Sequence, residues 1–429
     1  MAIIKLNHSV KYGNEYLNVI KETQVFYALM KLTYQLPEGF QRLPINLCLV
    51  IDTSTSMKGY ALDVVKRTLV NLHQYLSPDD YVSLVVFNDR ADTLLRATKI
   101  GDFGSLTRYV MRMHAEGGTE IYQGLKRGYV QLVRSPIFRK STSLLLLLTD
   151  GQTYGDDEMC MRLVRSANQE GVIFSAFGLG DEWNDEFLDQ LVGYSGGEVT
   201  YLSEVSEFGD LLGKYLALSQ IIEIPQVVFS FDTHPCVAVT SLHRMSAGVT
   251  PLLAYGNTFH LGSLRASREL EFLFELKISP VTGALNRLDM VRGTFSAHHL
   301  PGDTELSTEN LIFGVPFDLE KKNRNVPDGK VLQSVYHISL YRMQAAARKL
   351  IRQGDIDTGI NTLKNLARQL AAQGQDALAT SVLEESNFIE EHQHYSDSGE
   401  KKIKYGTRVL PSVTAPAIRA APTKKVELK

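Results

Sequence analysis

Five oxygen-bearing side chains fall at the ends of predicted structural elements, where they could together hold a metal ion. Asp52, Ser54 and Ser56 alternate along a loop that follows a strongly apolar run. An apolar run closed by an aspartate and small hydroxyl residues is typical of a buried strand that ends in a loop. Thr119 follows two glycines, and Asp150 comes at the end of a leucine-rich run. Carboxylate and hydroxyl oxygens suit a small hard cation, so the pattern predicts a divalent-cation site.

The elements that position these side chains alternate between strand-like and helix-like segments from residue 45 to about 220. The strand-like segments are 45–52, 81–87, 142–149, 172–179 and 199–202, with a hairpin partner at 93–98. The segments with helical periodicity are 58–76, 103–113, 119–133, 156–169, 184–194 and 206–219. This alternation predicts a doubly wound α/β domain with a mostly parallel sheet. The carboxyl ends of its strands meet at one edge, where ligands bind, so the five side chains are expected to converge there.

The segments that flank this domain have a different pattern. Residues 14–35 and 224–316 show β-type alternation with prolines between the runs, which favours an antiparallel sandwich. The N-terminal piece has no nearby partner, so we expect it to pair with strands after residue 224. The α/β domain is then an insertion in the sandwich. Helical periodicity returns after residue 330 with glycine breaks, and predicts three antiparallel helices.

The chain is therefore expected to divide into five parts. These are N-terminal strands of the sandwich (1–44), the α/β domain (45–220), the rest of the sandwich (221–325), a three-helix bundle (326–395) and a flexible tail (396–429).

The metal-site residues resemble the von Willebrand factor A (vWA) family with an intact metal-ion-dependent adhesion site (MIDAS). The Asp-x-Ser-x-Ser string at 52–56, the threonine of Gly117-Gly118-Thr119-Glu120 and the aspartate of Thr149-Asp150-Gly151 match the family's three loops in order. The resemblance covers about residues 45–220 and implies that the serines, and usually the threonine, contact the ion. It implies that the two aspartates act mostly through water.

A cation held mainly by neutral ligands stays electrophilic, so an acidic group from a partner can complete its coordination. The resemblance therefore implies a protein partner that supplies a Glu or Asp side chain. Mg²⁺ is the expected ion because of its octahedral preference, with Mn²⁺ or Ca²⁺ as alternatives.

Composition narrows the function classes further. The net charge of −3 gives no reason to expect binding to nucleic acid or to an anionic membrane. The most hydrophobic run is far shorter than the roughly 20 residues of a membrane helix, and the N-terminus does not resemble a signal peptide. Three scattered cysteines suit a reducing compartment, so a cytoplasmic protein is expected.

The sequence favours a binding module over an enzyme. It contains no Gly-x-x-x-x-Gly-Lys-[Ser/Thr] phosphate loop and no Gly-x-Ser-x-Gly nucleophile motif. Mg²⁺-dependent phosphohydrolases carry a second aspartate two residues after the first, where this chain has Ser54, which is no acid–base group near neutral pH. The alternatives are an accessory subunit of an ATPase-driven, signalling or defence complex, a scaffold with a dormant metal site, or such a hydrolase.

Individual members of the predicted site also have a structural explanation. Asp52, Ser54 and Thr119 could each cap a helix instead of binding an ion. Glu120, beside Thr119, is typical of a first-turn carboxylate that favours a helix N-terminus, although it could touch ion-bound water.

Three features outside the predicted site have both a functional and a structural interpretation. His392 and His394 are ligand-type residues, but their i, i+2 spacing does not share a helix face, so a solvated helix end is expected. Trp183 is either a partner contact at the ligand-binding edge or a packed loop aromatic. The basic run 401–405 is expected to be a solvated linker.

Overall fold

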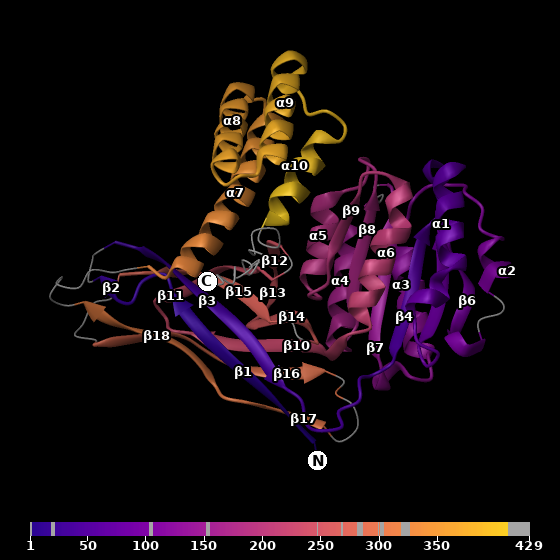
Figure 1. Ribbon diagram of the computed structural model, residues 1–429, viewed down its shortest axis with the longest axis horizontal. Coiled ribbons are helices and arrows are strands. Elements are labelled where there is room, and N and C mark those ends of the chain that lie inside the picture. The colour runs from indigo at the N-terminus through magenta and orange to yellow at the C-terminus, as the bar shows by residue number, and fades with distance from the viewer. Residues whose placement is uncertain are drawn as a thin grey trace, which may run out of the picture.

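The computed structural model describes residues 2–18, 22–102, 106–151, 155–246, 248–266, 269–280, 286–298, 300, 304–318 and 327–410. Figure 1 shows an α/β domain at one end, a β-sandwich at the other, and a helical bundle that rises where the two meet. The expected fold class, an α/β domain inserted in a sandwich and followed by helices, is confirmed.

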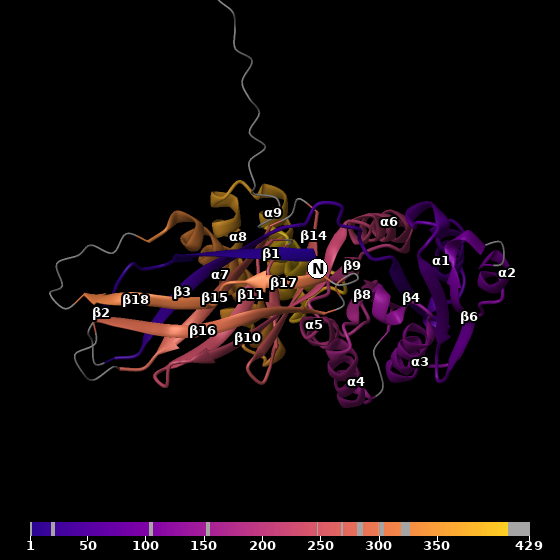
Figure 2. The same ribbon diagram turned by 90° about the horizontal axis from the view of Figure 1, so that it is seen from below.

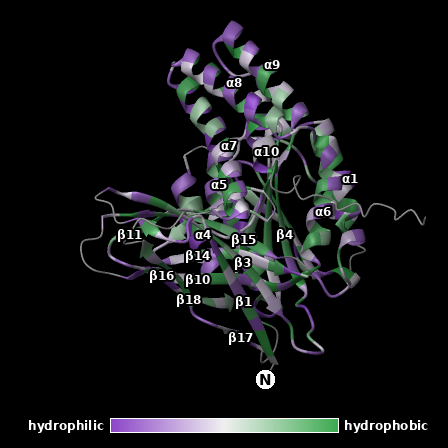
Figure 3. Cartoon of the chain, turned by 60° about the vertical axis from the view of Figure 1, so that its left-hand side comes forward, coloured by the Kyte–Doolittle hydropathy of each residue, from purple (hydrophilic) through white to green (hydrophobic). Residues whose placement is uncertain are grey.

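The α/β domain is built on a six-stranded sheet with the order β6-β5-β4-β7-β8-β9. Its strands are β4 (Ile45–Asp52), β5 (Tyr81–Phe87), β6 (Ala91–Lys99), β7 (Thr142–Thr149), β8 (Ile173–Leu179) and β9 (Val199–Leu202). All neighbours are parallel except β5 and β6, which form the predicted hairpin. Every residue of β4 and β7 is buried, as expected for central strands covered on both faces. Figure 3 shows β4 mainly in the hydrophobic colour, as suits a strand in the interior.

Helices cover both faces of this sheet. They are α1 (Tyr60–Val70), α2 (Leu106–Val110), α3 (Ile121–Arg134), α4 (Asp157–Gln169), α5 (Asp185–Gly193) and α6 (Phe208–Ser219). Because side chains alternate along a strand, Leu47 and Leu49 of β4 pack with α1, α2 and α6, whereas Cys48 and Val50 pack with α3, α4 and α5. Figure 2 shows α1 and α6 on one side of the strands and α3 and α4 on the other.

The sandwich combines the N-terminal strands with those that follow the α/β domain. One sheet has the order β12-β11-β15-β3-β1-β17 and the other β13-β14-β10-β16-β18-β2. The strands are β1 (Ala2–Tyr12), β2 (Leu17–Asn18), β3 (Gln24–Gln35), β10 (Ile222–Thr233), β11 (Val237–Arg244), β12 (Thr250–Leu252), β13 (Ala254–Tyr255), β14 (Thr258–Arg265), β15 (Leu270–Ile278), β16 (Arg287–His298), β17 (Thr304–Thr308) and β18 (Leu311–Asp318).

The pairing of β3 with β15 joins the two halves of the sandwich across the inserted domain. Most pairs are antiparallel, as expected, but β1 pairs with β17 and β2 with β18 in parallel. Strand β1 lies within residues 1–44, assigned to the sandwich, but precedes residues 14–35, where the β-type pattern was found.

The helical bundle contains the three predicted helices, α7 (Gly329–Arg352), α8 (Ile356–Ala372) and α9 (Asp376–His392). A further helix, α10 (Gly399–Arg408), lies where the sequence predicted a flexible tail from residue 396, so that prediction was wrong at its start. Residues 411–429 of the predicted tail lie outside the described residues.

The interpretation of 401–405 as a solvated linker was also wrong. Lys401 and Lys404 are buried against the α/β domain, at 6% and 4% exposure. Burial of a cation requires a partner, and α5 provides it: Lys404 contacts Asp185 and Asp189, while Arg408 lies 2.7 Å from Asp189. Carboxylates remote in sequence thus turn a basic segment into an interdomain contact.

The sandwich also contacts the α/β domain directly. The buried Arg244 guanidinium donates hydrogen bonds of 2.6 and 2.9 Å to the carbonyl oxygens of Gly196 and Gly197, between α5 and β9. None of the described helices is both long enough and apolar enough to span a membrane.

Candidate metal centre

Asp52 lies at the end of β4, beside the end of β7. The two strands pair in register up to Ile51 and Leu148, so Asp52 and Thr149 leave the sheet side by side. The Thr149 hydroxyl donates to Asp52 Oδ2 at 2.6 Å, and the Ser54 backbone N–H donates to Asp52 Oδ1 at 2.8 Å. Asp52 is fully buried, and both its oxygens are held by these two neutral donors.

The two serines of the motif meet Asp150 across the sheet edge. Residues 55–57 form one turn of 3₁₀-helix, and the Ser54 and Ser56 hydroxyl oxygens lie 3.0 Å apart. The Ser56 hydroxyl lies 2.9 Å from Asp150 Oδ1, and the Ser54 hydroxyl lies 3.5 Å from the same oxygen. Ser54 is buried and Ser56 is exposed, so this group of oxygens opens toward solvent.

Thr119 is brought to the same point by a second loop pinned to the first. The Thr55 backbone N–H and hydroxyl both donate to the Gly117 carbonyl, at 3.1 and 2.9 Å, and the Glu116 N–H donates to the Thr53 carbonyl at 2.8 Å. Gly117 has a φ of +77°, a conformation that glycine adopts without strain. A Cβ built on Gly151 would lie 3.2 Å from Thr119 Oγ1, which places that hydroxyl against the residue that follows Asp150.

The carboxylates of this site have no basic partner among the residues that the structure describes. Burial raises the pKa of Asp52 to about 6, against the hydrogen bonds from Thr149 and Ser54. Burial also raises the pKa of Asp150, opposed by the Ser56 hydroxyl. Among the described residues, no lysine, arginine or histidine forms an ion pair with either aspartate. Two desolvated carboxyl groups beside three hydroxyls form an all-oxygen donor set that fits a hard divalent cation.

The capping alternative does not explain the hydroxyls. Ser54 precedes the 3₁₀ turn, but its side chain makes no capping hydrogen bond. The N-cap position of α3 is held by Glu120, not Thr119, and its side chain also makes no capping bond. In the described part of the chain, no group of three or more His, Cys, Asp or Glu side chains is placed to hold a metal. Any ion here would therefore depend on the serine and threonine oxygens.

The other candidates from the sequence have structural roles. Trp183 is 2% exposed, packs against Tyr201 and Tyr405, and donates from Nε1 to the Gly180 carbonyl, so of its two interpretations the packed loop aromatic is confirmed and the partner contact is not. His392 is exposed and stacks on Phe388, which agrees with a solvated helix end.

Two contributors were missed in the sequence. Thr149 orients Asp52, and the only signal for it was a hydroxyl residue directly before Asp150. Glu182, in the loop after β8, lies near enough to Asp150 that its charge adds to the rise in the pKa of that carboxyl. The strand order brings both residues to this edge, because β8 neighbours β7.

The packing of Trp183 on β8 gives a test of this edge. A Cβ on Gly178 would lie 2.0 Å from Trp183 Cε2, so no side chain fits there without movement of the indole. We expect Gly178→Ala to destabilise the protein by roughly 1–3 kcal/mol or more through overpacking. Urea denaturation followed by tryptophan fluorescence measures this directly, because Trp183 is the single tryptophan. An unchanged midpoint would contradict the packing.

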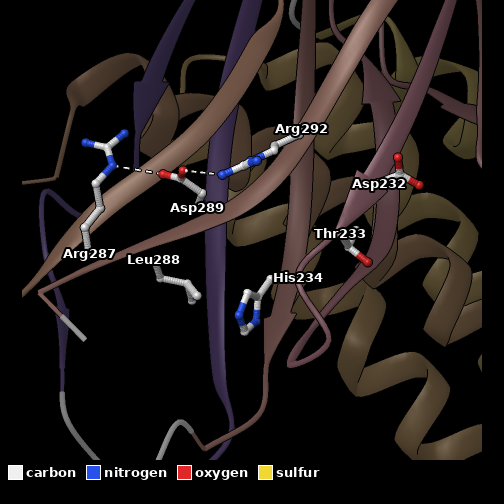
Figure 4. Close-up of a pocket in the computed structure, with 7 residues that line it drawn as sticks. All are labelled: Asp232, Thr233, His234, Arg287, Leu288, Asp289 and Arg292. Atoms are coloured by element: carbon white, nitrogen blue, oxygen red, sulfur yellow. Dashed lines mark hydrogen bonds and ion pairs between the residues drawn. The ribbon is translucent and has the colours of Figure 1, made fainter. Parts of the chain in front are cut away.

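The hollow shown in Figure 4 lies in the sandwich, away from these residues. It has a volume of about 490 Å³ and is lined by Asp232, Thr233, His234, Arg287, Leu288, Asp289 and Arg292. Its two arginines both contact Asp289, at 2.9 and 3.2 Å. The cations are already paired, and none of the lining residues belongs to the α/β domain, so this hollow is separate from the metal centre.

Two parts of the chain match models of known protein families. Residues 46–214 match the model of the von Willebrand factor type A domain, and residues 329–412 match that of the Sll0103-like, C-terminal alpha-helical domain. The uncharacterized protein sll0103 of Synechocystis sp. is 24% identical over 374 residues, which cover 85% of this chain and 87% of that protein.

Two solved structures share the whole arrangement of domains. The von Willebrand factor type A protein from Catenulispora acidiphila has a TM-score of 0.74 and 14% identity, covering 94% of this chain and 96% of its own. The ArnB paralog VWA2 from Sulfolobus acidocaldarius has a TM-score of 0.56 and 14% identity, covering 94% and 98%. At this identity the likeness shows the fold. The chain therefore has a vWA-like α/β fold over residues 46–214, joined to a β-sandwich and to a C-terminal helical domain that matches the Sll0103-like type.

Proposed function

We propose that this protein is a metal-dependent protein-interaction module whose vWA domain binds an acidic side chain of a partner through a divalent cation. The observation that carries the proposal is the convergence of the Ser54, Ser56 and Thr119 hydroxyls with two carboxyl groups that form no ion pair with a basic side chain in the described part of the chain. Interaction with other proteins is the general role of vWA domains, which agrees with this site.

The residues divide by position into those that would touch the ion and those that would orient the site. Ser54, Ser56 and Thr119 would supply neutral oxygens. Asp52 is already engaged by Thr149 and by the Ser54 N–H, and Asp150 by the serine hydroxyls, so both suit an outer role through water. When bound, a cation in such a set attracts a carboxylate from outside the chain. Mg²⁺ is the proposed ion, with Mn²⁺ or Ca²⁺ as alternatives.

Binding is a better proposal than turnover for the same geometry. Hydrolysis needs a general acid or base within reach of the substrate. The position two residues after Asp52 holds Ser54, and the Asp52 oxygens are both occupied by hydrogen bonds from within the domain. The partner is proposed to be a protein, and a cytoplasmic location is proposed from the three scattered free cysteines.

Affinity capture with the tagged full chain tests the proposal. Capture is carried out in about 5 mM Mg²⁺, a concentration above the dissociation constants of most weak divalent-cation sites. We expect the partner to be captured by the wild type under these conditions. Capture should be lost when EDTA replaces Mg²⁺, and in the Asp52→Ala and Ser54→Ala variants. Asp63→Ala, which removes an exposed carboxylate from α1 outside the site, is the matched control and should behave as wild type. Capture that is indifferent to chelation and to both site substitutions would refute metal-dependent recognition.

A further inference from the structure

The turn that follows α9 places two exposed histidines side by side. Helix α9 ends at His392, and Gln393 has a φ of +64°, the only positive value at a non-glycine residue in the described part of the chain. The chain changes direction there, and the centres of the His392 and His394 rings lie 6.2 Å apart. Because the helix stops at His392, the i, i+2 spacing that separates two side chains on a helix does not apply to this pair.

Both imidazole rings are held in the same tautomer. His392 Nδ1 lies 3.0 Å from the Phe388 carbonyl oxygen, and His394 Nδ1 lies 2.7 Å from the Tyr395 carbonyl oxygen. A carbonyl oxygen can only accept a hydrogen bond, so each Nδ1 carries the proton and donates it. Each Nε2 of the neutral ring is then unprotonated and has a lone pair to offer. Histidines that bind a metal through Nε2 are oriented in this way, by a hydrogen bond from Nδ1 to a carbonyl or carboxylate oxygen.

Phe388 fixes the plane of the His392 ring. The two rings stack with 4.1 Å between their centres and 12° between their planes, and Phe388 also makes a T-shaped contact with His394 at 5.8 Å. A metal ion binds in the plane of an imidazole, so a ring stacked on its face leaves Nε2 accessible. Both histidines are exposed, so an ion can reach them from solvent.

The separation of the two rings suits a single metal ion. An imidazole nitrogen binds Zn²⁺ at about 2.1 Å, which puts the ring centre roughly 3.2 Å from the ion, so two rings can share one ion when their centres are up to about 6.4 Å apart. The observed 6.2 Å falls within this limit. His394 is exposed, so rotation of its side chain can bring the angle at the ion toward a tetrahedral value. Water or a side chain from another molecule would fill the remaining positions.

We propose that His392 and His394 form a second metal site, which binds a first-row transition-metal ion, with Zn²⁺ as the expected ion. Imidazole nitrogen suits Zn²⁺, whereas the hydroxyl and carboxyl oxygens at the edge of the α/β sheet suit a hard cation such as Mg²⁺. The two sites therefore select different ions, and this inference does not depend on the function proposed above.

The test is calorimetric titration of ZnCl₂ into the full chain with the Ser54→Ala substitution, in excess Mg²⁺, so that the candidate metal centre does not compete for Zn²⁺. We expect this chain to bind Zn²⁺. Adding His392→Gln or His394→Gln should weaken that binding roughly 10-fold or more, because loss of even an outer-shell group commonly costs this much. His73→Gln, which removes an exposed histidine after α1, is the matched control and should leave the affinity unchanged.

The two histidine variants must agree, because one ion is shared by both rings. No Zn²⁺ binding before these substitutions, or an unchanged affinity after either of them, would overturn the inference. If a variant fails to fold by circular dichroism, wild-type crystals soaked in ZnCl₂ and measured at the zinc absorption edge decide instead. An anomalous peak between the two Nε2 atoms is expected, and its absence would overturn the inference.

The two proposals can fail separately. Partner capture in Mg²⁺ should be the same for His392→Gln as for the wild type, since this turn belongs to the C-terminal helical domain and not to the α/β domain. Loss of Mg²⁺-dependent capture in His392→Gln would contradict the independence of the two sites.

Discussion

Asp52→Asn is expected to raise the melting temperature of the metal-free protein at pH 7.5 and to abolish its response to Mg²⁺. Burial raises the pKa of Asp52 from 3.8 to about 6, so the charged carboxylate is unfavourable in the metal-free fold. A shift of this size corresponds to about 3 kcal/mol at most. Asparagine keeps the shape and can still accept from the Ser54 N–H while it donates to Thr149. We expect a gain of about 1–3 kcal/mol in the free energy of unfolding, or roughly 1–3 °C for unfolding of the whole chain.

The pH dependence has a defined sign. Because the folded-state pKa of Asp52 is raised, its contribution to the stability of the metal-free wild type is greatest below 3.8 and is lost as pH rises through about 6. The stability of Asp52→Asn should show no such fall with rising pH, because asparagine does not titrate. Mg²⁺ should stabilise the wild type at pH 7.5 more than at pH 5, because the cation competes with protons for the carboxylate.

Calorimetric melts in EDTA and in Mg²⁺, at both pH values, measure these effects. Asp63→Asn, an exposed substitution on α1, is the control. A strongly lowered melting temperature of Asp52→Asn in EDTA would show that Asp52 has a structural role instead.

Asp185→Ala is expected to have the largest destabilising effect. Asp185 is 3% exposed and accepts two hydrogen bonds of 2.7 Å from Arg348, and it also contacts Lys404. Loss of this carboxylate leaves two buried cations with fewer partners, which typically costs about 3–5 kcal/mol. The effect should extend to the contact between helices α5, α7 and α10, because all three helices meet at this group.

The same group predicts acid sensitivity. Burial alone would raise the pKa of Asp185, but Arg348 and Lys404 outweigh it and hold the pKa well below its usual range. A lowered folded-state pKa stabilises the protein above the unfolded value of 3.8, and that stabilisation is lost as pH falls below it.

Urea denaturation of wild type and Asp185→Ala at pH 7 and pH 3 tests both points. The free energy of unfolding of Asp185→Ala should be lower than that of the wild type by several kcal/mol at pH 7, that is, about 3–5 kcal/mol, and by less at pH 3. Glu158→Ala, on the exposed first turn of α4, is the control. A difference below about 1 kcal/mol at pH 7 would show that the ion pairs contribute only as much as surface pairs do.

The candidate site was predictable because its residues follow from strand order. In a parallel sheet the carboxyl ends of the strands reach the same edge, so Asp52 at the end of β4 and Asp150 directly after β7 had to approach one another once the alternation of strands and helices was recognised. Thr119 required more: its position depends on the Thr55 and Gly117 contact between loops, which the family resemblance implied but residue spacing alone does not.

Helix α10 was not predictable from local pattern. Its lysines and arginine have the composition of a solvated segment, and their burial depends on Asp185 and Asp189, more than 200 residues earlier. Trp183 was ambiguous for the same reason, because its partner Tyr405 belongs to α10. The ion pairs with Asp185 and Asp189 therefore decide that this segment is a buried helix, although its composition favours a solvated segment.

The most direct test of the central claim is the location of a bound ion. Crystals of the full chain soaked in MnCl₂ and measured at the manganese absorption edge should give an anomalous peak among the hydroxyl oxygens of Ser54, Ser56 and Thr119, with Asp52 and Asp150 within reach through water. The peak should be absent from Ser54→Ala crystals. A peak elsewhere, or none at this site in fully soaked wild-type crystals, would contradict the assignment.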